Sequence, residues 1–164
     1  MQLKFKKLHS SAVFPTYATE GSAGMDLYAT ERNEFPTIHI GKHAISIIDC
    51  GFALELPYGF YGKIESRSSL ASRGIVVVGG ILDSDYRGEV KVMLLNATSK
   101  LVALDAQKAI AQLVILPIIR ASLQVVTELN PTRRGDGAFG STDAKPLADI
   151  YSDNLAPFIM RSGT

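Results

Sequence analysis

The chain has 164 residues, a formal net charge of +1 and a single cysteine. This length gives room for one domain with a hydrophobic core rather than two independent domains. A net charge so close to zero gives no reason to expect a nucleic acid as partner, and one cysteine excludes an intramolecular disulfide framework. Cys50, in an Asp-Cys-Gly-Phe setting, is expected to be a small buried filler rather than a nucleophile.

The sequence shows no sign of secretion or membrane insertion. Its N-terminus, MQLKFKKLHS, alternates apolar and polar residues and has no continuous apolar signal core. The longest apolar stretch, residues 109–119, is interrupted by Gln112 and Pro117 and is too short to cross a bilayer. We therefore expect a soluble, cytoplasmic protein with no membrane partner, and a nuclear or host-cell location stays open.

Short segments in which apolar and polar residues alternate recur along the chain and predict an all-β fold. They lie around residues 3–5, 45–47, 52–56, 60–64, 90–94 and 123–125. Turn-forming residues separate them closely enough for a distorted jelly-roll or β-barrel subunit. One short helix is expected over residues 68–72, where serine hydroxyls could cap its first turn.

Two polar motifs precede the middle of the chain. His39 and His43 have the spacing of a helical metal site, but isoleucines and a glycine around them favour a turn between strands, so we expect no zinc site. Arg67, Ser68 and Ser69 follow an apolar strand and open the expected helix. Their amides and hydroxyls suit an anion site at the helix N-terminus, and a capping box with a surface arginine is the alternative.

Residues 79–88 carry the most informative pattern, Gly-Gly-Ile-Leu-Asp-Ser-Asp-Tyr-Arg-Gly, between two apolar β-type runs. We interpret them as a hairpin connection that carries chemistry. Gly79 and Gly80 can adopt positive φ and leave backbone groups accessible, which suits a slot for a flat polar ligand. Asp83 would lie beside that slot. Asp85 could interact with it, or one of the two carboxylates could cap the turn.

The composition changes from Arg133 onward to Gly, Ser, Asp and Pro. We therefore divide the chain into a β core (residues 1–132), a mobile Gly-rich arm (133–142) and a C-terminal extension of unknown role (143–164). An arginine, an aromatic residue and two hydroxyls spaced by glycines suit an arm that closes over a flat, anionic ligand. A merely solvated tail is the alternative.

Taken together, these segments resemble the five motifs of the trimeric dUTPase family, in order. The matching segments are residues 23–27, 59–64 with 67–71, 80–88, 110–113 and 134–142. The resemblance implies a homotrimer with sites at subunit boundaries that hydrolyses dUTP to dUMP and pyrophosphate. It also implies Mg²⁺ as cofactor, held mainly by the triphosphate and water, so no protein metal ligands are expected.

The resemblance assigns a role to each site residue. Asp83 would be the general base on the water that attacks the α-phosphorus, and Asp26 would support the site. Gly80 would contact the uracil edge, and Tyr86 would pack under the deoxyribose where a 2′-hydroxyl has no room. The phosphates would be held by Arg67, Ser68, Ser69, Gln112 and Arg134. The arm would close through Phe139, stacked on uracil, and through Gly140, Ser141 and Thr142 over the phosphates.

Some positions depart from the family pattern. Gln107, Lys108 and Ala109 stand where the fourth motif usually has Gly-Asp-Arg, which puts a turn and a structural ion pair in doubt. Ser69 and Ala138 replace glycines.

Two rival functions remain. The related dCTP deaminases depend on a glutamate ten residues after the third-motif aspartate, and that position is Met93 here. A nucleotide-binding regulatory protein with little catalysis would not need Asp83, which is present. Hydrolysis of dUTP is therefore the function that the sequence favours.

Overall fold

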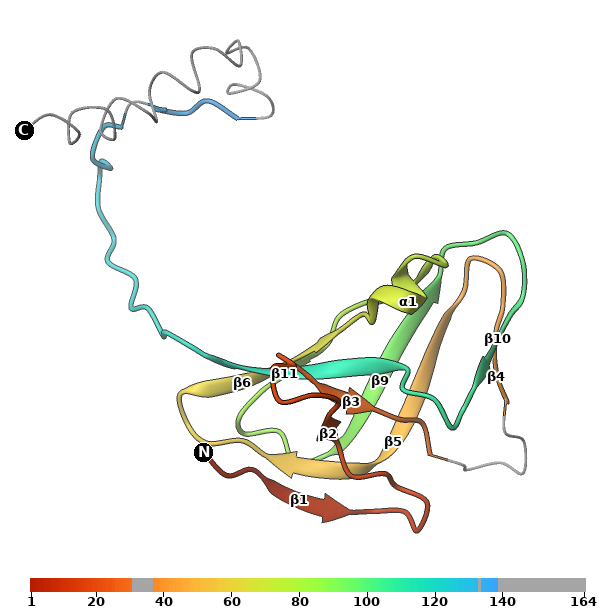
Figure 1. Cartoon of the computed structure of the whole chain (residues 1–164). Helices are drawn as coiled ribbons and strands as arrows, with labels where there is room; N and C mark the ends of the chain where they lie inside the picture. Colours follow the sequence, from red (N-terminus) through yellow and green to blue (C-terminus); the bar gives the residue numbers. More distant parts are fainter. Residues whose placement is uncertain (31–36, 133, 139–164) are drawn as a thin grey trace, which may run out of the picture. The chain divides into compact units, whose positions relative to one another are not determined.

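The computed structural model describes residues 1–30, 37–132 and 134–138 (Figure 1). The chain divides into two compact units, Met1–Ala121 and Ser122–Thr164, and every described helix and strand lies in the first. In chain order the elements are β1 (Lys4–Lys7), β2 (Thr16–Tyr17), β3 (Met25–Leu27), β4 (Thr37–Ile40), β5 (Ile45–Glu55), β6 (Phe60–Glu65), α1 (Ser68–Ala71), β7 (Ile75–Val77), β8 (Ile81–Leu82), β9 (Glu89–Asn96), β10 (Val102–Asp105) and β11 (Ala111–Pro117).

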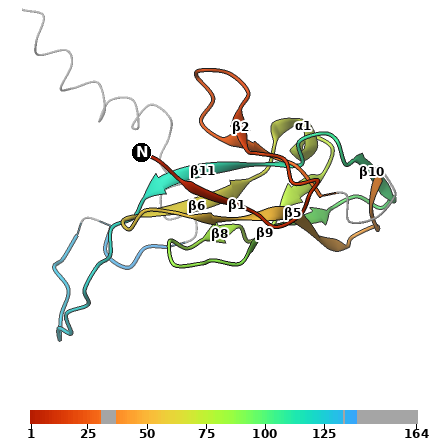
Figure 2. The same ribbon diagram turned by 90° about the horizontal axis from the view of Figure 1, so that it is seen from below.

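The strands form three antiparallel sheets (Figure 2). A four-stranded sheet has the order β1-β5-β9-β7, a five-stranded sheet has the order β2-β3-β11-β6-β8, and β10 pairs with β4. The all-β class with one short helix is thus confirmed, although the sheets of the described chain do not join into a closed barrel. Within the described residues, no helix is long and apolar enough to span a membrane.

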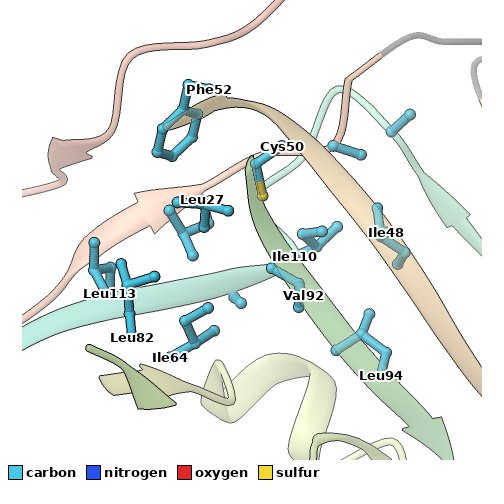
Figure 3. Close-up of a cluster of buried hydrophobic side chains, with 14 of the residues drawn as sticks. Leu27, Ile48, Cys50, Phe52, Ile64, Leu82, Val92, Leu94, Ile110 and Leu113 are labelled. Carbon is cyan, nitrogen blue, oxygen red and sulfur yellow. The ribbon is translucent and has the colours of Figure 1, made fainter. Parts of the chain in front are cut away.

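The two larger sheets share one hydrophobic core (Figure 3). Along β9, Val90 and Val92 are buried while Lys91 between them is exposed, as expected for a strand with one face on the core. Leu27 and Leu113 reach the same core from the five-stranded sheet. Because fully burying a side chain of this size contributes about 1.5–3 kcal/mol, this packing fixes how the sheets face each other.

The hairpin expected around residues 79–88 forms, with an addition that the sequence did not indicate. β7 and β9 pair as predicted, with Val77 opposite Leu94. Their connection contains β8, which pairs with β6 of the other sheet, Leu82 opposite Gly62. The chain therefore crosses from one sheet to the other inside the predicted connection. A strand of two residues is too short to show periodicity, which is why the sequence did not reveal it.

Two local predictions were wrong. The helix N-cap is Arg67, in an extended conformation and without a side-chain capping bond, so the serine hydroxyls do not cap α1. The strand expected at residues 123–125 does not form in the described chain, where Leu123 and Val125 are 97% and 99% exposed. Alternating apolar and polar residues form a strand only where another strand supplies hydrogen-bonding partners. The described residues of the second unit contain no such partner strand.

Cys50 is fully buried, as expected for a core filler. Burial raises the pKa of its thiol from 9.0 to about 12, and the Glu89 and Asp49 carboxylates add to the shift. A folded-state pKa above the unfolded value stabilises the fold below pH 9, and this contribution is lost as the pH rises from 9 towards 12.

We predict that the free energy of unfolding falls more steeply between pH 9 and 11 in the wild type than in a Cys50→Ala variant. The difference should reach about 1.4 kcal/mol per pH unit, because only the wild type has a thiol that deprotonates on unfolding. Urea unfolding at several pH values measures it. Equal slopes for the two proteins would show that Cys50 does not titrate on unfolding.

Candidate active site

A row of polar side chains crosses the outer face of the five-stranded sheet. Asp26 on β3 lies opposite Gln112 on β11, and Gln112 lies opposite Glu65 on β6. Directly opposed residues of antiparallel strands project from the same face. Their neighbours Leu27 and Leu113 are buried on the other face. The strand register therefore gathers these polar groups on the side away from the core.

A hollow of about 380 Å³ adjoins this row. It contains five of the residues expected at the site, brought together from β3, β11 and the start of α1. The lining residues are Ala18, Ser22, Ala23, Gly24, Asp26, Arg67, Ser68, Ser69 and Gln112. Ala18 and Ser22 were not predicted, because they precede the first motif and no spacing rule connects them to it. The hollow is rich in hydrogen-bond donors, which is what an anionic ligand requires.

Arg67 is oriented by two contacts. Its Nε lies 3.5 Å from Asp26 Oδ1, and its Nη1 donates a hydrogen bond of 3.2 Å to the Ala109 carbonyl. The arginine side chain is 33% exposed and the aspartate side chain 16%. A guanidinium has five N–H donors, so these contacts leave others available to a ligand. Asp26 thus lies beside Arg67, and its expected supporting role stays a prediction.

The turn that the sequence put in doubt is formed. Asp105 Oδ1 accepts a hydrogen bond of 2.9 Å from the Gln107 backbone N–H, and the Asp105 carbonyl accepts one of 3.1 Å from Lys108. The carbonyl of the next residue, Ala109, accepts the hydrogen bond from Arg67. Every residue type has this backbone group. Replacement of the usual residues therefore leaves the local support of Arg67 in place.

Gln112 is held in the hollow by its surroundings. Its Nε2 donates a hydrogen bond of 3.3 Å to the Ser66 carbonyl. A methyl group on Gly24 would lie 3.1 Å from both Cβ and Oε1 of Gln112, so the absence of a side chain at Gly24 leaves space for the amide. The amide oxygen and the second N–H remain for a ligand.

Gly79 and Gly80 form the crossing between the sheets, both with positive φ (74° and 96°). The Gly80 carbonyl accepts a hydrogen bond of 2.7 Å from the Ile64 N–H. The sequence predicted that this carbonyl would be available to the uracil base of a ligand. In the structure one of its two lone pairs already accepts the bond from Ile64. At Gly79 an added methyl group would overlap the Met93 side chain, so the methionine packs against the crossing.

Asp83 follows β8 directly and is exposed. Its carbonyl accepts a hydrogen bond of 3.2 Å from the Tyr86 N–H, which closes the turn. Tyr86, 41% exposed, donates through its hydroxyl to the Glu89 carbonyl at 3.0 Å. Its ring lies against Gly88, where any side chain would overlap it. Asp83 and Tyr86 are therefore presented together on one ordered turn.

This turn is distant from the hollow within one chain. On β6, Glu65 lies opposite Gln112, and Lys63, two residues away, lies opposite Ile81. Asp83 is two residues further along the chain than Ile81, in the direction that leads away from Gln112. At about 3.3 Å per residue and ~4.8 Å per strand, Asp83 and Gln112 are about 13 Å apart along the strands and ~10 Å apart across them. Asp83 is not among the residues that line the hollow.

Arg134 belongs to the second unit, where its Nε donates a hydrogen bond of 2.9 Å to the Gly137 carbonyl. Phe139, Gly140, Ser141 and Thr142 lie outside the described residues, as does the extension from residue 143. Their expected roles stay predictions.

The dUTPase family model matches residues 10–143. The chain belongs to the dUTPase family. The deoxyuridine 5′-triphosphate nucleotidohydrolase of Hydrogenobaculum sp. is 39% identical over 148 residues, which cover 88% of this chain and 100% of the relative. The protein of the same name from Paramecium bursaria Chlorella virus 1 is 42% identical over 141 residues, with 85% and 96% covered.

Solved dUTPases have the same fold. The structure of the Staphylococcus bacteriophage 80alpha dUTPase with dUpNHpp aligns with a TM-score of 0.76 and 24% identity, covering 85% of this chain and 97% of that one. A dUTPase of Staphylococcus aureus phage phi11, described with a structural Mg(II) ion, has a TM-score of 0.70 and 21% identity, with 80% and 100% covered. The jelly-roll-like architecture is thus confirmed.

The geometry at Gly80 yields a prediction with a matched control. Gly80 and Gly59 both have positive φ (96° and 86°), but a methyl group at Gly80 would lie 2.7 Å from the Ile64 carbonyl oxygen, whereas at Gly59 it would meet nothing within 4 Å. We expect Gly59→Ala to cost about 1–2 kcal/mol from backbone strain alone and Gly80→Ala to cost at least about 1 kcal/mol more. Urea unfolding of both variants measures the difference. Equal losses would show that the crossing relaxes freely.

Proposed function

We propose that this protein hydrolyses dUTP to dUMP and pyrophosphate. The observation that carries the proposal is the hollow that brings Arg67, Gln112 and two serines together, supported by family membership and by the activity named for its relatives. Phosphoryl transfer depends mainly on positioning and on neutralisation of charge. A donor-rich hollow with an oriented arginine supplies both.

In this proposal the hollow binds the phosphates. The guanidinium of Arg67 and the amide of Gln112 donate to phosphate oxygens, together with the hydroxyls and N–H groups of Ser68 and Ser69. The first N–H groups of a helix have no acceptor within the helix and are free to bind an anion. Asp26 contributes indirectly, because it holds Arg67 in place.

The turn after β8 would supply the remaining chemistry. Asp83 acts as general base on the water that attacks the α-phosphorus, since its carboxylate is exposed at the end of a strand that the sheet fixes. General-base catalysis of this kind contributes about a hundredfold to ten-thousandfold in rate. Gly80 offers its N–H and the free lone pair of its carbonyl to the uracil edge, and the Tyr86 ring packs against the deoxyribose.

Mg²⁺ would enter with the triphosphate. Among the described residues no three His, Cys, Asp or Glu side chains come together as a metal site. Mg²⁺ commonly keeps several waters and is bound through substrate phosphates, and the donors of the hollow fit a triphosphate loaded in this way. When bound, the ion neutralises charge on the phosphates.

We infer further that the site is shared between subunits of a homotrimer. The distance between Asp83 and the hollow within one chain supports this, because a general base must come within hydrogen-bond reach of the reacting group, directly or through one water. A closed cyclic assembly brings one patch of each subunit against a different patch of the next. Asp83 of one subunit would then meet the hollow of its neighbour.

The arm would complete the site. Arg134 would reach the γ-phosphate, Phe139 would stack on uracil, and Gly140, Ser141 and Thr142 would close over the phosphates. Exclusion of water by such closure strengthens every charge interaction inside the site.

We predict that Asp83→Asn lowers kcat by at least about a hundredfold while nucleotide binding and the fold persist, because the change removes the base and preserves the shape. Asp85→Asn is the matched control: an exposed carboxylate two residues further on, expected to retain most activity. Pyrophosphate release from dUTP measures both. Near-normal turnover by a pure Asp83→Asn preparation would exclude Asp83 as the base.

The packing of Tyr86 on Gly88 leads to a prediction about sugar selection. Gly88→Ala should displace the tyrosine ring, because the new methyl group would overlap it, and should lower the preference for dUTP over UTP by about tenfold or more. Gly21→Ala, where a methyl group meets nothing within 4 Å, is the control. The ratio of kcat/KM for the two nucleotides measures the effect. An unchanged ratio in Gly88→Ala would separate Tyr86 from sugar selection.

A further inference from the structure

Ser66 joins two parts of the candidate site that lie on different sheets. It stands between the end of β6 at Glu65 and the helix N-cap at Arg67. Its hydroxyl oxygen accepts a hydrogen bond of 2.7 Å from the Val77 backbone N–H, and its carbonyl accepts one of 3.3 Å from Gln112 Nε2. The motifs identified in the sequence did not include this residue.

The Val77 N–H needs an acceptor because β7 is an edge strand. β7 pairs only with β9, and the Val78 N–H donates towards β9, to the Met93 carbonyl at 3.0 Å. Successive N–H groups of a strand point to opposite sides, so the Val77 N–H points away from β9. No sheet neighbour is present there among the described strands. The Ser66 hydroxyl takes the place of that neighbour, and it comes from the residue that follows β6 of the other sheet.

This bond fixes the start of the crossing that leads to Asp83. Val77 precedes Gly79 and Gly80, whose positive φ angles carry the chain to β8. The far end of the crossing is fixed by the hydrogen bond from the Ile64 N–H to the Gly80 carbonyl. Ser66 and Ile64 belong to the same stretch of chain, so one segment anchors both ends.

We propose that Ser66 is a positioning residue for the reaction: through Val77 its hydroxyl sets where the crossing begins, and thereby where Asp83 and Tyr86 lie. The inference rests on the proposed hydrolysis of dUTP. The two polar groups of Ser66 have separable roles, because its hydroxyl holds the crossing while its carbonyl holds Gln112. A substitution that removes only the hydroxyl should therefore disturb the base and leave the phosphate hollow intact.

The test compares Ser66→Ala with Ser66→Thr, which restores a hydroxyl, and with Ser72→Ala. This last variant removes an exposed serine hydroxyl that donates to the Ser69 carbonyl. We expect Ser66→Ala to lower kcat for dUTP about tenfold, because small displacements of a catalytic group have effects of this size. KM should change by less than about threefold, since the Gln112 contact persists. Ser66→Thr should recover most of kcat, and Ser72→Ala should match the wild type.

Hydrogen exchange gives a readout that does not depend on activity. The segment 75–80 should exchange at least about tenfold faster in Ser66→Ala than in the wild type or Ser66→Thr, because the Val77 N–H loses its acceptor. If alanine prevents folding, Ser66→Cys decides, since its sulfur is a weak acceptor: the segment 75–80 should then exchange faster than in the wild type, and kcat should be lower than in the wild type.

Three results would overturn the inference: a wild-type kcat in Ser66→Ala or Ser66→Cys, the same loss in Ser66→Thr as in Ser66→Ala, or unchanged exchange of the segment. Failure of the proposed function would look different. The wild type itself would then release no pyrophosphate from dUTP, whereas accelerated exchange would still show that the hydroxyl anchors the crossing.

Discussion

The antiparallel register of β3, β11, β6 and β8 is the constraint on which the site depends. It places Asp26, Gln112 and Glu65 in one row and puts Asp83 further along the same sheet. Register in turn follows from burial, because a slip by one residue would bring the core leucines to the surface and the polar row into the core. The hydrophobic core therefore determines the position of the polar groups that bind substrate in the proposed function.

A second constraint is the crossing between sheets at Gly79 and Gly80. An added methyl group at Gly80 would lie 2.7 Å from the Ile64 carbonyl oxygen, so Gly80 has no space for a side chain, and at Gly79 it would displace the flexible end of the Met93 side chain. The turn that carries Asp83 thus follows backbone that the rest of the fold holds at positive φ. Strained or glycine-dependent backbone of this kind is common at functional sites, where surrounding packing must maintain it.

Much of this arrangement could be predicted from the sequence. Alternating apolar residues indicated the β-class, and the apolar runs on either side of residues 79–88 indicated the β7–β9 pairing. The motifs indicated residues that the structure brings into one hollow, such as Arg67 and Gln112. The sequence could not show β8, which is too short for periodicity, or the bond between Ser66 and Val77, which joins different sheets. It also predicted a strand at residues 123–125 that does not form, because alternation does not reveal whether a partner strand is present.

The central claim is that Asp83 acts with the Arg67 of another subunit. The most direct test refolds Asp83→Asn and Arg67→Ala subunits together in equal amounts, and we expect each variant to be nearly inactive alone. In a trimer with shared sites, a site is intact when its Asp83 comes from an Arg67→Ala subunit and its Arg67 comes from an Asp83→Asn neighbour. Random assembly of equal amounts forms this combination at about one quarter of the sites, so the mixture should recover about one quarter of wild-type activity. Activity no greater than that of the separate variants would contradict the account, because it would place both residues of each site on one chain.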